Sequence, residues 1–172
     1  MFSPHKTDMM PPIDNYFWGD KMTTIIENVE ALQSYLGKEL EPTDWMEITQ
    51  DRINMFADAT EDHQFIHVDP EAAKLTPFGT TIAHGFLTLS LAPAFWSQIY
   101  RVEGVKMGVN YGLNKVRFIN PVKVNSRVRG KGKITNLGEA AGGTQITFEL
   151  TIEIEGEEKP ACIAETISLI YV

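Results

Sequence analysis

The sequence predicts an α+β protein in which an antiparallel sheet wraps around one buried helix. The first reason is the run from residue 81 to 100, TIAHGFLTLSLAPAFWSQIY, which is apolar on nearly every helical face. A helix with no polar face is buried on all sides. The second reason is that several strand-like runs follow this helix, at about 106–119, 122–136, 144–155 and 161–172.

Turn-forming residues separate or flank these runs, at Asn120-Pro121, Asn136-Leu137-Gly138 and Glu155-Gly156. We expect Pro93 to kink or end the long helix, because proline removes a backbone hydrogen bond. The sheet would have open edges, so we expect two chains to pair along one of them.

The chain before the long helix carries weaker patterns. Residues 1–22 contain adjacent prolines and no clear period, so we expect an N-terminal leader or extension ahead of one domain over 23–172. Residues 23–37 have helical spacing of apolar residues and end at Gly37. Residues 41–48 are expected to be extended.

Two capping residues mark helix starts in the next part of the chain. Thr49 is expected to cap a helix whose inner face is Ile53, Phe56 and Ala57. Further on, Asp69 and Pro70 have the residue types of an N-cap and a first helical position.

The composition is that of a soluble, folded domain. The chain has 172 residues, of which 43% are hydrophobic, and a single cysteine, Cys162. This excludes disordered, collagen-like and coiled-coil proteins. No apolar run reaches the roughly 18 residues of a membrane span, and no secretory signal is visible. A lone cysteine in a strand-like run indicates a reducing compartment, so we expect a cytoplasmic protein.

The charge is unevenly distributed. The chain carries a net charge of −8, yet residues 104–138 hold no acidic residue and the following basic ones: Lys106, Lys115, Arg117, Lys123, Arg127, Arg129, Lys131 and Lys133. The last four alternate, which in a strand places them on one face. They form either a solvated outer face of the sheet or a docking surface for a phosphate or an acidic carrier protein. The overall acidity argues against nucleic-acid binding.

Polar residues that can perform chemistry cluster between positions 62 and 84. Asp62, His63, His67, Asp69 and His84 have three possible interpretations. They are capping and surface residues, or His63 and His67 bind a metal from one helix face, or Asp62 and His67 activate a water by acid–base chemistry. The approach to the Asp69-Pro70 pair argues against a continuous helix through His67, and hence against the metal.

Gly85 adds an independent feature. If Thr80 or Thr81 caps the buried helix, amides of its first turn have no partner within the helix. Gly85 would then offer an N–H with no side chain beside it, at the positive end of the helix dipole, where an oxyanion is stabilised. Close packing of the helix against its neighbours would explain the glycine equally well.

The stretch from Phe56 to Leu89, with DHQFIHVD and FGTTIAHGFLTLSL, resembles the hydratase motif of the MaoC-like dehydratases, which include the (R)-specific enoyl-CoA hydratases. The variants are most similar to the NodN-type branch. The resemblance continues through residues 111–134 and covers about 23–172. It implies a hot-dog fold, a homodimer or higher homo-oligomer, and an acyl-CoA or acyl carrier protein thioester as substrate, with no cofactor or metal.

The resemblance also implies roles for individual residues. Asp62 and His67 match the catalytic pair of the family, and Gly85 matches the glycine whose amide polarises the thioester carbonyl. Gln64 stands where an asparagine usually helps to fix the loop, and we expect Gln64 and His84 to contact substrate.

The basic segment would hold the phosphates of the carrier, with Arg117 and Lys123 as candidates. A hot-dog thioesterase and a non-catalytic acyl-CoA or carrier-protein binding module are the alternatives. The thioesterase would usually place a carboxylate on the central helix, where residues 81–100 have none.

Overall fold

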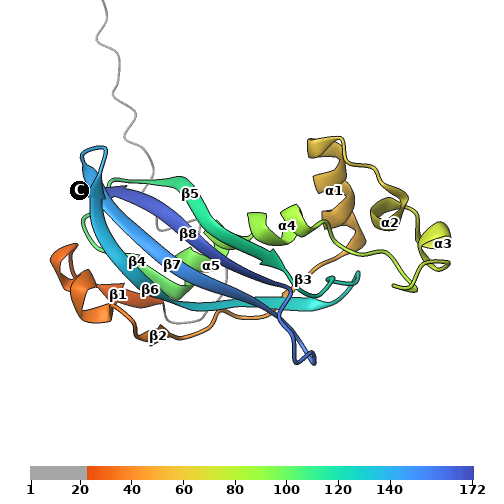
Figure 1. The fold of residues 1–172 in the computed structure, drawn as a ribbon, viewed down its shortest axis with the longest axis horizontal. Helices are drawn as coiled ribbons and strands as arrows, with labels where there is room; N and C mark the ends of the chain where they lie inside the picture. The colour runs from red at the N-terminus through yellow and green to blue at the C-terminus, as the bar shows by residue number, and fades with distance from the viewer. Residues whose placement is uncertain (1–22) are drawn as a thin grey trace, which may run out of the picture.

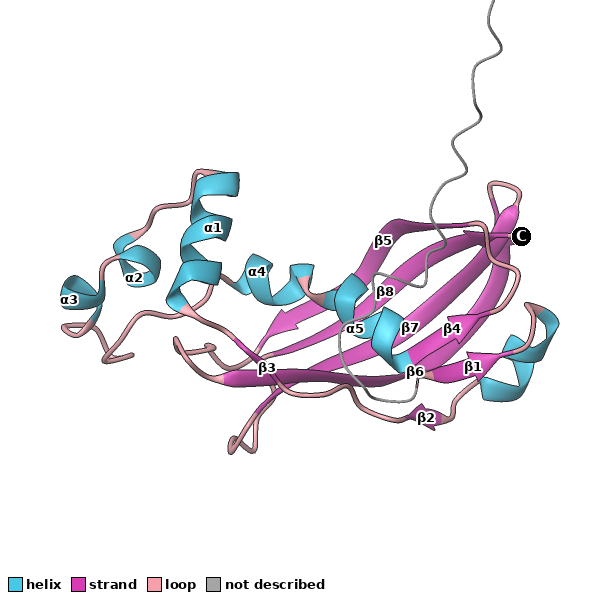
Figure 2. Cartoon of the chain, turned by 180° about the vertical axis from the view of Figure 1, so that it is seen from behind, coloured by secondary structure: helices cyan, strands magenta, loops and turns pink. Residues whose placement is uncertain are grey.

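A computed structural model describes residues 23–172 of the chain, so the predicted leader at 1–22 lies outside the described residues. The described part confirms the α+β arrangement. A curved antiparallel sheet has the strand order β2-β6-β7-β8-β5, and β3 pairs with β6 as well. Its concave face holds helix α5, while α1, α2 and α3 form a separate lobe beyond the end of the sheet (Figure 1). The view from behind in Figure 2 shows α5 lying across the strands.

The four predicted strands are present with shifted ends. They are β5 (Met107–Phe118), β6 (Arg127–Ala140), β7 (Gly143–Ile154) and β8 (Cys162–Tyr171). The largest shift is in β6, which begins five residues later than expected. The intervening residues make a turn in which Asn125 has a φ of 63°. Lys123 in this turn forms an isolated bridge with Ile82, so the segment joins the sheet to the site instead of extending the strand.

The predicted long helix is two shorter ones, α4 (Gly85–Ser90) and α5 (Ala92–Ile99). The break at Leu91 confirms the effect expected of Pro93, the second residue of α5, where a missing backbone N–H is tolerated. The start of the helix differs from the expectation. His84 is the N-cap and makes no side-chain cap hydrogen bond, so neither Thr80 nor Thr81 caps the helix.

The N-terminal segment is only partly helical. The short strand β1 (Thr24–Ile26) pairs in parallel with β4 (Tyr100–Val102), and the 3-10 helix η2 (Glu30–Tyr35) follows. The helical spacing therefore gave the wrong structure for Ile26, which is fully buried as a strand residue. Gly37 ends the segment with a φ of +74°, a left-handed conformation that favours glycine. The extended pieces expected over 41–48 reduce to β3 (Met46–Glu47), preceded by β2 (Glu39–Leu40).

Both predicted helix starts in the lobe are confirmed. Helix α1 (Gln50–Thr60) begins after Thr49, whose Oγ1 accepts a hydrogen bond from the amide of Arg52 at 3.3 Å. Asp69 lies between α2 (Phe65–Val68) and α3 (Pro70–Ala73), and its carboxylate accepts from the amides of Glu71 and Ala72. On α1 the side chains of Ile53 and Ala57 are fully buried.

Helix α5 packs closely on β6 because a glycine faces it. A Cβ built on Gly130 would lie 2.7 Å from the Cβ of Phe95, which is closer than side-chain carbons approach. Phe95 itself is fully buried. The absence of a side chain at position 130 thus sets the separation between helix and sheet.

The alternating basic residues of β6 lie on the outer face of the sheet, where each pairs with a carboxylate. Arg127 contacts Glu155, Arg129 and Lys131 contact Glu153, and Lys133 contacts Glu149 and Glu39. This pattern supports the interpretation as a solvated face, since the carboxylates neutralise the charges that a phosphate would need. Within residues 23–172, no helix has the length and apolar character needed to cross a membrane.

Candidate active site

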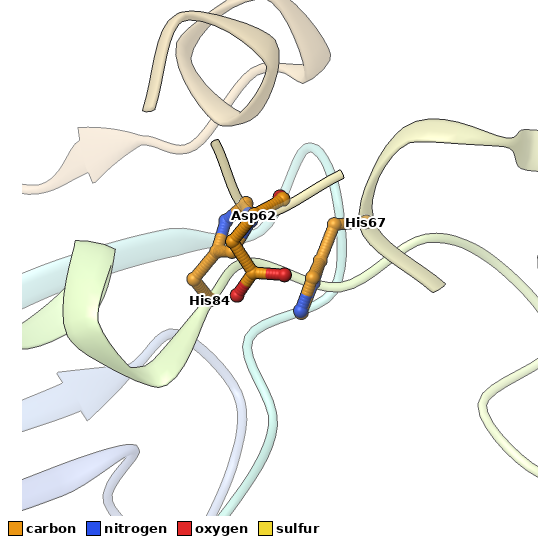
Figure 3. A group of neighbouring side chains, drawn as sticks. All are labelled: Asp62, His67 and His84. Carbon is orange, nitrogen blue, oxygen red and sulfur yellow. The ribbon is translucent and has the colours of Figure 1, made fainter. Parts of the chain in front are cut away.

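Asp62, His67 and His84 come together where the helical lobe meets the sheet (Figure 3). Each offers one potential ligand atom, and these atoms lie within 4.8 Å of one another. Asp62 follows α1 and is exposed, whereas His67 on α2 and His84 at the start of α4 are only 6% and 3% exposed. The site therefore has a carboxylate open to solvent beside two imidazoles that are shielded from it.

The backbone at the end of α1 directs Asp62 toward the histidines. Glu61 ends the helix in the left-handed region with a φ of 60°, which turns the chain sharply at the next residue. The carbonyl of Asp62 accepts a hydrogen bond from His84 Nε2 at 2.9 Å. The carboxylate thus projects from a backbone that the neighbouring histidine holds.

His67 has a defined tautomer in this environment. Its Nδ1 lies 2.7 Å from the carbonyl oxygen of Ile82, which can only accept, so Nδ1 carries the proton. Burial lowers the pKa of His67, and this outweighs the opposing effects of the Ile82 hydrogen bond and the charge of Asp62. The ring is then neutral at pH 7, with the lone pair on Nε2. This nitrogen is able to accept a hydrogen bond from water.

His84 packs against two other rings. Its ring stacks on that of His67 with centroids 3.8 Å apart, and Phe56 lies on it at 5.1 Å. The ring atom Nδ1 is buried and has no hydrogen-bond partner in the described part of the chain. His84 thus contacts Asp62, His67 and Phe56, and it is not among the residues that line the cavity described next.

A cavity of about 350 Å³ opens next to His67. Its walls include Gly85, Thr88, Phe118 and Asn120. Gly85 is the first residue of α4, so its amide has no acceptor within the helix. A Cβ at this position would lie 3.1 Å from the Phe118 ring. The glycine therefore keeps open the space between the free amide and the cavity wall.

The remaining predicted site residues lie on the periphery. Gln64 is exposed, and its backbone carbonyl accepts from the amide of His67 at 2.9 Å, so it contributes to the loop through its main chain. Arg117 and Lys123 are exposed and flank the cavity residues Phe118 and Val122. Neither of these two basic residues is among those that line the cavity.

One residue that organises the site could not be recognised from sequence patterns. Gln50, the first residue of α1, donates from Nε2 to the carbonyl of His67 at 2.7 Å and accepts at Oε1 from the hydroxyl of Thr81 at 2.6 Å. No local pattern signals these contacts, because their partners are 17 and 31 residues away along the chain.

The arrangement suits a water better than a metal ion. The His67 and His84 rings are stacked with an interplanar angle of 27°, so their in-plane lone pairs do not converge on one point. The metal site considered from the sequence, formed by His63 and His67 on one helix face, is excluded for another reason. His63 precedes α2, and its ring pairs with Asp58 at 2.9 Å, so it does not share a helix face with His67.

An antiparallel sheet wrapped around a helix, with a carboxylate–imidazole pair at the helix end, defines a hot-dog protein of the hydratase and dehydratase type. Comparison with known proteins agrees. A family model described as "MaoC like domain" matches residues 31–157. The chain belongs to this family, and it is an enzyme of the hydratase and dehydratase class.

Individual relatives support the same assignment. The "3-hydroxyacyl-thioester dehydratase Z" of Mycobacterium tuberculosis is 54% identical over 142 residues, which is 82% of this chain and 94% of the relative. "Nodulation protein N" of Rhizobium leguminosarum bv. viciae is 48% identical over 141 residues, 80% of this chain and 87% of the relative.

Among solved structures, an (R)-hydratase from A. caviae involved in PHA biosynthesis is 25% identical, with a TM-score of 0.65 over 77% of this chain and 94% of that one. The expected family, the NodN resemblance and the hot-dog fold are confirmed.

Proposed function

We propose that this enzyme adds water reversibly to a trans-2-enoyl thioester, giving an (R)-3-hydroxyacyl thioester. The observation that carries the proposal is the hydrogen bond between His67 Nδ1 and the carbonyl of Ile82, which leaves Nε2 available. His67 lines the cavity and lies close to Asp62. The name of the mycobacterial relative and that of the A. caviae hydratase support the same reaction.

In the hydration direction, Asp62 and His67 hold one water between them. As the water oxygen bonds to C3 of the substrate, one water proton passes to this pair, with the Asp62 carboxylate as base. The electrons of the C2–C3 double bond move toward the thioester carbonyl and give an enolate. The pair then returns a proton to C2 through His67 Nε2, which restores both groups to their starting protonation states.

The amide of Gly85 would bind the thioester oxygen. Negative charge develops on this oxygen only as the enolate forms, so a fixed N–H there stabilises the transition state more than the substrate. The cavity adjoins both Gly85 and His67, so one bound thioester can reach both groups.

The carrier of the acyl group is coenzyme A or an acyl carrier protein. Coenzyme A carries phosphates, and carrier proteins are acidic, so both need cations at the mouth of the site. The basic residues of β6 are paired with carboxylates, which leaves the exposed Lys106, Lys115, Arg117 and Lys123. Of these we favour Arg117 and Lys123, which adjoin the cavity-lining residues Phe118 and Val122 in the sequence.

We also propose that two chains join through β5. This strand pairs only with β8 among the described strands and forms one edge of the sheet. Both of its faces carry exposed apolar side chains: Met107, Val109, Tyr111, Leu113 and Phe118. A long apolar edge of this kind favours pairing with a second copy about a two-fold axis.

The test of the reaction follows the absorbance of the enoyl-thioester double bond after the protein is added to crotonyl-CoA and to a longer 2-enoyl-CoA. The Asp62→Asn and His67→Ala variants are measured in parallel. Loss of the band with formation of (R)-3-hydroxyacyl-CoA, abolished in both variants, would establish the reaction and the pair.

Other outcomes point to the alternatives. Free thiol released from the substrate would identify a thioesterase. A thermal shift with acyl-CoA, but no turnover of either CoA or carrier-protein substrates, would identify a binding module. Sedimentation of the full chain tests the dimer, which a monomer at micromolar concentration would contradict.

A further inference from the structure

We infer that Gln50 is a positioning residue that fixes the orientation of His67; the catalytic consequence of this inference rests on the proposed function. Besides its bonds to His67 and Thr81, its Nε2 donates to Oδ1 of Asn54 at 2.9 Å. Both N–H groups and the oxygen of this side-chain amide are therefore engaged. The carbonyl of His67 can only accept, which sets the Nε2 side of the amide toward it.

The amide controls His67 at two points. It binds the main-chain carbonyl of His67 directly. It also binds Thr81, and the adjacent residue Ile82 holds the ring through its carbonyl at 2.7 Å from Nδ1. The side chain of Gln50 therefore holds the backbone of His67 directly, and it holds the imidazole indirectly through Thr81 and Ile82.

Other contacts complete a closed frame around this amide. The amide of Ile82 donates to the carbonyl of Ile66 at 3.0 Å, which links the segment before α4 to α2 a second time. Thr81 is only 1% exposed, so its hydroxyl has no ready access to water if Gln50 is removed. Loss of the amide would leave a buried hydroxyl unpaired and let the two segments separate.

This frame matters because the chemistry depends on where Nε2 lies. A water held between Nε2 and Asp62 requires both atoms within hydrogen-bond reach, and a displacement of about 1 Å can cost on the order of 100-fold in rate. Gln50 does not touch the substrate cavity, so it would affect the rate of the reaction more than substrate binding.

The test compares Gln50→Glu and Gln50→Leu with Thr49→Ala. Glutamate keeps an acceptor for Thr81 but replaces the donor to His67 with a carboxylate. Thr49→Ala removes the cap of the same helix and leaves the amide of Gln50 in place, so it is a matched control for helix stability. All variants are assayed for turnover and for the pH dependence of kcat.

For both Gln50 variants we expect kcat to fall about tenfold or more, with KM changed less than about threefold. The titratable groups that face His67 are Asp62 and His84. A further negative charge at position 50 would favour the imidazolium form, so in Gln50→Glu the acid limb of the kcat profile should move to higher pH. Thr49→Ala should lower the melting temperature while leaving kcat and the acid limb as in the parent.

A second readout does not depend on activity. NMR of the labelled histidine rings reports the tautomer and the pKa of His67 in each variant. A changed tautomer or shifted ring signal of His67 in Gln50→Leu and in Thr81→Val, neither of which adds a charge, supports the inference even if the parent shows no hydration. A parent without activity would instead count against the proposed reaction.

The inference is overturned if kcat and the His67 ring signals of Gln50→Leu and Thr81→Val match those of Thr49→Ala. If Gln50→Leu does not fold, Gln50→Glu and Thr81→Val decide the question by the same criteria.

Discussion

The imidazole of His67 stacks face to face on that of His84, with the ring centroids 3.8 Å apart. Nδ1 of His67 donates to the backbone carbonyl of Ile82, which is close to His84 in the sequence. Nε2 of His84 donates to the backbone carbonyl of Asp62, which is close to His67 in the sequence. The stack therefore couples the two members of the proposed catalytic pair, since His84 contacts the ring of one and the backbone of the other.

His84→Phe tests this coupling. Phenylalanine keeps an aromatic ring against His67 but cannot donate to the Asp62 carbonyl, which would leave the Asp62 loop less fixed. We expect kcat to fall by about 10- to 100-fold, the cost of one lost hydrogen bond of roughly 1–3 kcal/mol. His84→Ala loses the stack as well and should be slower still. Equal rates in the parent and His84→Phe would contradict the coupling.

The lowered pKa of His67 predicts a pH dependence of turnover. The ring must be neutral to accept a hydrogen bond at Nε2, so kcat should be constant around pH 7 and fall as the pH drops through a pKa below the ordinary value of 6.5. A pH–rate profile of the parent enzyme measures this. An acid limb centred above 6.5 would be inconsistent with burial of a neutral ring.

The same pKa affects stability. Below pH 6.5 the unfolded chain binds a proton at His67 that the folded protein resists, so the free energy of unfolding should decrease as the pH falls from 6.5 toward the lowered pKa. Denaturant unfolding at several pH values would reveal this. In His67→Asn the contribution of this ring to the pH dependence of the free energy of unfolding should disappear. His63→Asn alters an exposed histidine and should leave that contribution in place.

Gly85→Ala should obstruct the cavity. The new Cβ would lie 3.1 Å from the Phe118 ring and beside the amide that the thioester oxygen is proposed to reach. We expect kcat/KM to fall by about 10- to 100-fold with little change in melting temperature. Adding Phe118→Leu should recover part of the activity, because it relieves the contact. No loss in Gly85→Ala would remove the role proposed for this amide.

The β6–β7 hairpin offers a change that should stabilise the fold. Ala141 has a φ of 49° in the two-residue turn before Gly143, a conformation that asparagine and glycine tolerate better than alanine. Ala141→Asn should raise the free energy of unfolding by about 0.5–1 kcal/mol. Ala140→Asn, at the adjacent position without a positive φ, is the control and should not stabilise.

Local patterns in the sequence predicted much of the fold. The caps at Thr49 and Asp69 depend on neighbouring amides, and the strands on alternation within each run, so both could be recognised without knowledge of the tertiary structure. The strand β1 could not, because its partner β4 lies far along the chain and the spacing of Ile26 fits a helix equally well.

The residues of the candidate site also fall into those that could be recognised from the sequence and those that could not. Asp62 and His67 are close in the sequence and were recognised by their motif. The contacts of His84 with Asp62 and of Gln50 with Thr81 span 22 and 31 residues, and polar residues so far apart show no period. The ion pairs across β6 and β7 were likewise invisible before the strand register was known, although the alternation correctly predicted one exposed face.

The edge position of β5 has a consequence for local opening. Within residues 23–172 the outer side of β5 has no partner strand, so its amides should exchange hydrogen with solvent far sooner than those of β7 at the centre of the sheet. A second copy paired there would protect those amides by mass action. The exchange rate of β5 would then slow as protein concentration rises, while that of β7 would follow global unfolding.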